Sequence, residues 1–169
     1  MQKLSKPMYE HPNIIKLLEV YNSPSHILLR MEDGGPQNLH SYLRRLEVKR
    51  LPLALHKAKS IISQSVGALS HLHLKAAVAH RDIKPENIIV NESAYGVTIK
   101  LCDFGLAQSF GANIVSYSFC GTFPFMSPEM ISGSAYRPVP TDVWSMGMVI
   151  TEVCCNTNVI LKAASVHKA

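Results

Sequence analysis

The stretch that decides the fold is His-Arg-Asp-Ile-Lys-Pro-Glu-Asn at positions 80–87. Two short runs rich in β-branched residues follow it, at 88–90 and 97–101, with a polar turn between them. This pattern predicts two antiparallel strands joined as a hairpin. Such a hairpin would bring Asn87, just before its first strand, beside Asp103, just after its second.

An amide oxygen and a carboxylate that meet at one sheet edge are both hard oxygen ligands for a metal ion. Mg²⁺ prefers hard oxygen ligands and commonly takes its remaining ligands from water and phosphate groups. The local topology therefore predicts a phosphate-handling magnesium site with Asn87 and Asp103 as its ligands.

Three motifs resemble those of the protein kinase family. Positions 80–87 are similar to the catalytic loop, and Asp-Phe-Gly at 103–105, sixteen residues after Asn87, is similar to the metal-binding motif. Ser-Pro-Glu at 127–129 stands where the family has Ala-Pro-Glu. Ten specified positions, at about 5% usage per residue type, give a chance match on the order of 10⁻¹³ per placement. The resemblance implies an α+β protein-kinase-like fold, of the calcium/calmodulin-dependent-like type and truncated at both ends.

The resemblance also implies roles for the loop residues. Asp82 would act as catalytic base, Lys84 would meet the transferring phosphate, and Asn87 and Asp103 would hold Mg²⁺. ATP and Mg²⁺ are then the expected cofactors, and proteins the expected substrates. A capping aspartate or a turn asparagine is the purely structural alternative for each position.

Two residues favour a serine/threonine kinase within this resemblance. In the family, a lysine at the position of Lys84 accompanies serine/threonine specificity. A threonine at the position of Thr122 contacts the catalytic loop in kinases of that type.

The loop between the two later motifs is a candidate regulatory segment. Arg81 could pair with a phosphate placed on this loop. Ser118 is the preferred position for that phosphate by resemblance, and Ser116 and Tyr117 are weaker candidates. An ordinary polar loop that is never modified is the alternative.

The resemblance divides the chain into three parts: a small-lobe remnant at 1–32, a hinge at 33–38 and a large lobe at 39–169. In this division Met31 would guard the back of an adenine pocket. The backbone of Glu32 and Gly34 would hydrogen-bond the adenine edge, with a structural turn as the alternative.

Hydrophobic periodicity predicts the other elements. Two strands are expected between positions 14 and 31, and helices at 39–46, from Pro52 to about 75, and at 141–155. The last helix is apolar on nearly every face, with Thr141 or Asp142 as its cap and Cys154 and Cys155 in the core. By resemblance, Asp142 would brace the backbone of the catalytic loop.

Composition limits the partners. The chain has 169 residues, with 17 Lys and Arg against 12 Asp and Glu, which gives a formal charge of +5. The basic residues between 44 and 59 have no aromatic residues interleaved, so we expect a solvated surface and no nucleic-acid partner. No membrane partner is expected, and cysteines without a spaced framework favour the reducing cytoplasm, or the nucleus.

The alternative function is non-catalytic. None of the nine glycines forms the glycine-rich loop of a kinase, and no lysine and glutamate match the ion pair of the small lobe. We expect these 169 residues alone to show weak activity or none, and the alternative is a truncated kinase-like module that acts by binding partners. An exposed apolar patch is expected along the helix at 143–153.

Overall fold

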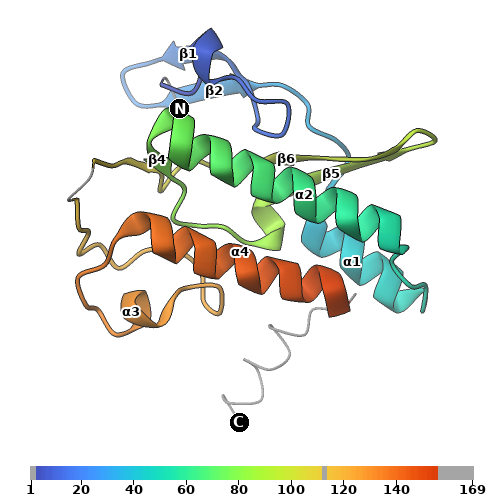
Figure 1. Cartoon of the computed structure of the whole chain (residues 1–169). Coiled ribbons are helices and arrows are strands. Elements are labelled where there is room, and N and C mark those ends of the chain that lie inside the picture. The colour runs from blue at the N-terminus through green and yellow to red at the C-terminus, as the bar shows by residue number, and fades with distance from the viewer. Residues whose placement is uncertain (1–2, 112–113, 156–169) are drawn as a thin grey trace.

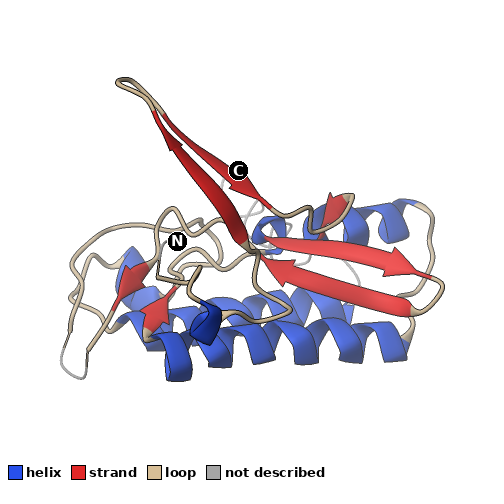
Figure 2. Ribbon diagram, turned by 90° about the horizontal axis from the view of Figure 1, so that it is seen from above, coloured by secondary structure: helices blue, strands red, loops and turns tan. Residues whose placement is uncertain are grey.

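The computed structural model describes residues 3–111 and 114–155 (Figure 1). Two long antiparallel hairpins dominate its β-structure, as Figure 2 shows from above. The first pairs β1 (Leu17–Asn22) with β2 (Ile27–Met31), and the second pairs β5 (Ile88–Ser93) with β6 (Gly96–Leu101). All four predicted strands are therefore confirmed.

Short strands complete the β-structure. β3 (Gln37–Asn38) pairs with β5 to give a three-stranded sheet, in the order β3-β5-β6. β4 (Val78–Ala79) pairs with β7 (Gln108–Ser109), which ties the start of the catalytic loop to the segment that follows Asp-Phe-Gly. A 3-10 turn, Pro85–Asn87, leads directly into β5.

The helices pack beneath the hairpins. α1 (Leu39–Val48) and α2 (Leu55–His71) confirm the two predicted helices. The apolar stripe of α2 packs against β6, and its predicted members Ala58, Ile61 and Leu69 are buried in the core, whereas Val66, also predicted to be buried, is 44% exposed. A π-helical turn, Leu72–Ala76, extends α2 towards the catalytic loop. α3 (Pro128–Ile131) is a single turn, and a 3-10 turn, Pro7–Tyr9, lies near the N-terminus.

Helix α4 (Pro138–Cys155) begins three residues before its predicted start. Thr141 and Asp142 therefore lie in its first turns and neither caps it: the Thr141 hydroxyl donates to the Pro138 carbonyl oxygen at 2.7 Å, and Asp142 faces the catalytic loop. Of the apolar patch expected along 143–153, only Val143 and Trp144 are exposed, whereas Met146, Val149 and Val153 are buried. The core placement of Cys154 and Cys155 is wrong, because both are exposed at the C-terminal end of α4.

Within the described residues, none of the helices is long and apolar enough to cross a membrane. The mixed α+β architecture predicted from the sequence is confirmed.

Candidate active site

Asp142 at the start of α4 holds the backbone of the catalytic loop. Its fully buried carboxylate accepts hydrogen bonds from the His80 amide at 2.8 Å and from the Arg81 amide at 2.7 Å. The ring of His73, in the π-helical turn, lies 2.8 Å from the same carboxylate. Because Arg81 has a φ of 66°, which non-glycine residues rarely adopt, this brace maintains a strained loop conformation.

His80 links the catalytic loop to the Asp-Phe-Gly motif. The Asp82 amide can only donate, so its 3.3 Å contact with Nδ1 of His80 places the ring proton on Nε2. Nε2 then donates to the Cys102 carbonyl oxygen at 2.9 Å, and burial lowers the pKa of His80. The ring also contacts Phe104, with the centroids 4.9 Å apart. A neutral imidazole thus joins the two motifs.

The Asp82 carboxylate lies at the centre of a polar network. Its Oδ1 accepts a hydrogen bond from the Thr122 hydroxyl at 2.7 Å, and its Oδ2 lies 2.8 Å from Nζ of Lys84. The Asn87 amide donates to Oδ2 at 3.1 Å. Burial acts to raise the pKa of Asp82, but the hydrogen bonds from these three residues outweigh it, so this pKa lies below its usual value. Asp82 is therefore ionised at neutral pH.

Thr122 closes this network from the candidate regulatory segment, the loop between Asp103 and Glu129. Nζ of Lys84 donates to its hydroxyl at 2.7 Å, while that hydroxyl donates to Asp82. The preceding residue, Gly121, has a φ of 100°, and a Cβ atom there would come within 3.0 Å of the Arg81 carbonyl oxygen. Glycine is required at 121 because the loop backbone passes so close to the catalytic loop.

The two residues proposed as magnesium ligands lie beside each other, as the hairpin predicts. The Cys102 amide donates to the Asn87 carbonyl oxygen at 2.9 Å, which brings Asp103 next to Asn87. The Asn87 amide nitrogen points to Asp82, with a further hydrogen bond to its carbonyl oxygen at 2.8 Å. An amide oxygen and a carboxylate at one sheet edge fit Mg²⁺, which keeps water and phosphate oxygens as other ligands.

The described residues contain no cluster of three or more His, Cys, Asp and Glu side chains that could hold a metal by themselves. The donor set at Asn87 and Asp103 thus requires further ligands from water or phosphate.

Arg81 contacts a serine other than the preferred candidate. Its Nη1 lies 3.3 Å from the hydroxyl of Ser116, which is buried, and its Nε donates to the Leu106 carbonyl oxygen at 2.7 Å. Ser118 is exposed, and its carbonyl oxygen accepts a hydrogen bond from the Tyr136 hydroxyl at 2.7 Å. The structure therefore brings Arg81 together with Ser116 and not with Ser118.

The expected adenine contacts lie near the end of β2. Met31 is 43% exposed. The Glu32 amide donates to the Lys16 carbonyl oxygen at 3.0 Å, so of its backbone groups only the carbonyl would remain for a nucleotide. Gly34 packs so closely on Ile89 that a Cβ atom would come within 3.1 Å of that side chain. Ile89 was not among the residues singled out from the sequence. The signal that could have identified it is its position on β5 between two buried residues.

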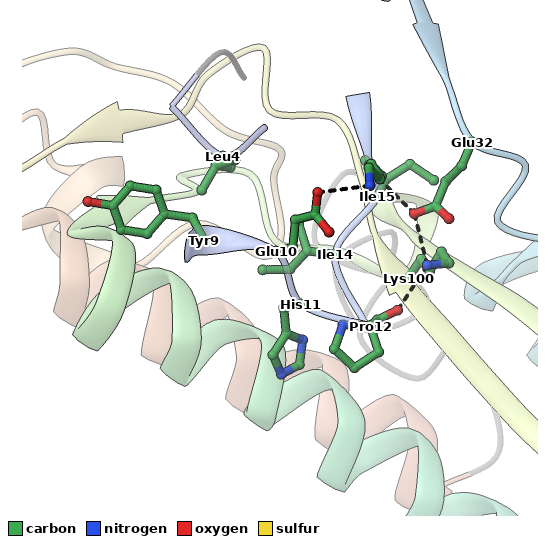
Figure 3. A pocket seen from close by; sticks show the side chains of 10 residues that line it. Leu4, Tyr9, Glu10, His11, Pro12, Ile14, Ile15, Glu32 and Lys100 are labelled. Carbon is green, nitrogen blue, oxygen red and sulfur yellow. Dashed lines mark hydrogen bonds and ion pairs between the residues drawn. The ribbon is translucent and has the colours of Figure 1, made fainter. Parts of the chain in front are cut away.

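A cavity of about 300 Å³ lies next to Glu32, between the N-terminal residues and β6 (Figure 3). Lys100 crosses it from β6, donating to the Pro12 carbonyl oxygen at 2.9 Å and pairing with Glu32 at 2.9 Å. Glu32 also accepts a hydrogen bond from the Lys16 amide at 2.7 Å. These contacts fix the segment before the hinge against the hairpin, and hydrophobic periodicity gave no signal for them.

This fold and this set of loop residues define a protein kinase domain. The family model described as protein kinase domain matches residues 2–168, so the chain belongs to the protein kinase family.

Similar proteins include several named as protein kinases. The chain is 34% identical over 158 residues to the mitosis inducer protein kinase cdr1 of Schizosaccharomyces pombe, covering 92% of this chain and 25% of that protein. It is 33% identical over 143 residues to sperm motility kinase 3A of Mus musculus, with coverages of 85% and 27%. It is 32% identical over 148 residues to the SNF-related serine/threonine-protein kinase of Rattus norvegicus, with coverages of 88% and 19%. The chain thus spans about a quarter or less of these relatives.

The cysteine next to the proposed metal ligand is expected to be inert. Burial, and then the charge of Asp103, raises the pKa of the Cys102 thiol to about 11. Because the thiolate is the reactive form, iodoacetamide at neutral pH should alkylate the exposed Cys154 and Cys155 and leave Cys102 unmodified. Peptide mass spectrometry measures this, and urea-unfolded protein is the control in which all four cysteines react. Alkylation of Cys102 as fast as Cys154 would contradict the expectation.

Proposed function

We propose that this chain is the catalytic core of a serine/threonine protein kinase that transfers the ATP γ-phosphate to hydroxyl groups of proteins. The observation that carries the proposal is the Asp82 carboxylate, which Lys84, Thr122 and Asn87 hold through hydrogen bonds and an ion pair. Phosphoryl transfer depends mainly on positioning a hydroxyl in line with the phosphate and on neutralising charge. This network supports both tasks.

Each member of the network has a distinct proposed role. Asp82 orients the substrate hydroxyl and accepts its proton. Lys84, held between Asp82 and Thr122, is the cation placed to meet the transferring phosphate. Asn87 and Asp103 would hold Mg²⁺, which neutralises charge on the phosphate oxygens when it is bound.

The nucleotide would lie at the end of β2. The proposed contacts are the Glu32 carbonyl and the backbone of Gly34, with Met31 at the back of the pocket. Ile89, packed against Gly34, would line the apolar side of the same pocket.

A radiometric assay tests this function. The whole chain is incubated with Mg²⁺, labelled ATP and three peptides that differ only in carrying serine, threonine or tyrosine. We expect slow, Mg²⁺-dependent labelling of the serine and threonine peptides. Labelling of the tyrosine peptide alone would refute the specificity, and the absence of labelling on all three would favour the non-catalytic alternative.

A second candidate function is partner binding by a non-catalytic kinase-like module. The observation that favours it is the exposure of all five residues of β2, among them Ile27, Leu28 and Leu29. A hairpin with apolar side chains in solvent offers an edge and a face to another chain. Unlabelled peptides together with concentration-dependent self-association or partner capture through this hairpin would favour it.

A further inference from the structure

The positive charge of the chain is concentrated at one end of the molecule. The segment 44–59 holds six of the 17 Lys and Arg residues and only one acidic residue, Glu47. The rest of the chain holds 11 basic and 11 acidic residues, so the formal charge of +5 comes entirely from this segment. It comprises the last turns of α1, the connecting turn and the start of α2, which meet at the right-hand end of Figure 1. We call it the basic turn.

Four of the six cations of the basic turn are exposed and lie outside the ion pairs that Glu92 makes. Glu92 on β5 pairs with Lys57 and with Arg45, the latter at 3.4 Å. Four exposed cations have neither an ion pair nor a side-chain hydrogen bond within the part of the chain that the structure describes: Arg44, Lys49, Arg50 and Lys59. Ion pairs with Glu92 therefore involve only two of the six cations of the basic turn.

Exposed aliphatic side chains lie among these cations. Val48 is 75% exposed, Leu51 50% and Leu55 70%, all within eight consecutive residues. Single surface aliphatic residues are ordinary, but three of them interleaved with four unpaired cations make an amphiphilic surface. Exposed aliphatic side chains of this kind would be more stable at an apolar boundary than in water.

The sequence led us to expect no membrane partner, but that expectation rested on the lack of a membrane-spanning run and does not concern attachment at the surface. We propose that the basic turn docks on the surface of a membrane that contains anionic phospholipid. Its unpaired cations would meet the headgroup phosphates and carboxylates, and Val48, Leu51 and Leu55 would enter the boundary with the acyl chains.

Shape favours a membrane over other anionic partners. An acidic peptide would bind best in a groove, and the cavities at the N-terminal segment and at the start of α4 are lined by no residue of the basic turn. Segment 44–59 contains no Phe, Tyr or Trp on which nucleic-acid bases could stack. A projecting turn with separated aliphatic side chains instead matches the plane of a lipid interface.

Docking in this orientation would leave the candidate active site accessible. His40, in the first turn of α1, lies 3.6 Å from Glu86 of the catalytic loop. The basic turn begins beyond this point and continues past the opposite end of α1. The two sites thus lie at different ends of one helix.

Vesicle co-sedimentation of the whole chain tests the proposal. Phosphatidylcholine vesicles with and without phosphatidylserine serve as probes, at low and high salt. The test variant carries Arg44→Gln, Lys49→Gln and Lys59→Gln. The matched control carries Lys6→Gln, Lys75→Gln and Arg137→Gln, which removes the same charge from exposed positions elsewhere.

We expect salt-sensitive binding to the phosphatidylserine vesicles only. Since each cation near an anionic surface contributes about a factor of five in binding, the test variant should bind about a hundredfold more weakly. The control variant should lose much less. Val48→Ala with Leu55→Ala should also weaken binding, whereas Met8→Ala with Leu74→Ala, at other exposed positions, should not.

Three results would overturn the proposal. The first is no binding to phosphatidylserine vesicles, and the second is an equal loss in the test and control variants, which would show a non-specific effect of net charge. The third is binding to polyglutamate or to a duplex oligonucleotide without binding to vesicles, which would assign the basic turn to an acidic polymer. Circular dichroism of each variant shows that the fold is retained.

Discussion

Asp142→Ala is expected to lower the free energy of unfolding by about 3–5 kcal/mol, because it leaves two buried backbone donors, those of His80 and Arg81, without an acceptor. This is a large fraction of the stability of an ordinary domain. The effect would arise although Asp142 lies in α4, about sixty residues from the loop that it holds. Urea denaturation followed by circular dichroism measures it.

Two further variants make this expectation specific. Asp142→Asn keeps one acceptor oxygen and should lose about half as much stability, so it remains informative if the alanine variant does not fold. Glu19→Ala removes an exposed carboxylate of β1 that pairs with Arg30, and it should shift the urea midpoint only slightly, because an exposed ion pair contributes about 0–1 kcal/mol. An Asp142→Ala midpoint equal to that of the parent chain would show that the loop does not depend on this brace.

Local patterns predicted the parts of the fold that depend on neighbours in sequence. The β-branched runs around a polar turn were enough to predict the β5–β6 hairpin, and the hairpin was enough to place Asn87 beside Asp103. The spacing of apolar residues likewise predicted α1 and α2. In each case the pattern that predicts the element lies within one short segment of the sequence.

Contacts between distant segments could not be predicted in this way. The brace from Asp142 was expected only from family resemblance, because no spacing relates α4 to the catalytic loop. The pairing of Lys100 with Glu32 and the contact of Arg81 with Ser116 depend on tertiary packing, which hydrophobic periodicity does not encode. The same limit explains the wrong core placement of Cys154 and Cys155: their helix is apolar, but which face is covered depends on its neighbours.

The network around Asp82 combines residues from one short segment with a residue from a distant loop. Asp82, Lys84 and Asn87 lie within six residues of each other, whereas Thr122 comes from a loop 40 residues away. The segment containing Thr122 can close on the catalytic loop because Gly121 permits a backbone contact that other residues would obstruct. Catalytic competence should therefore depend on the conformation of the loop that carries Thr122.

Asp82→Asn is expected to lower the rate of phosphoryl transfer by about 10²–10⁴-fold, the usual contribution of a general base. The amide keeps the size of the side chain but cannot accept the substrate proton. Labelled phosphate incorporated into a serine peptide under single-turnover conditions measures the rate. Glu19→Gln, an exposed carboxylate-to-amide change on β1, is the matched control and should retain the parent rate.

Variants of Thr122 test whether Thr122 and Asp82 contribute to phosphoryl transfer together or independently. Thr122→Val removes the hydroxyl that joins Lys84 to Asp82 and should slow transfer by about 10–100-fold, the range for a hydrogen bond to a charged group, whereas Thr122→Ser should restore most of the rate. If Thr122 acts only by positioning Asp82, the double variant with Asp82→Asn should be no slower than Asp82→Asn alone. Fully multiplicative losses in the double variant would show that Thr122 contributes separately, and an unchanged rate in Thr122→Val would remove it from the catalytic network.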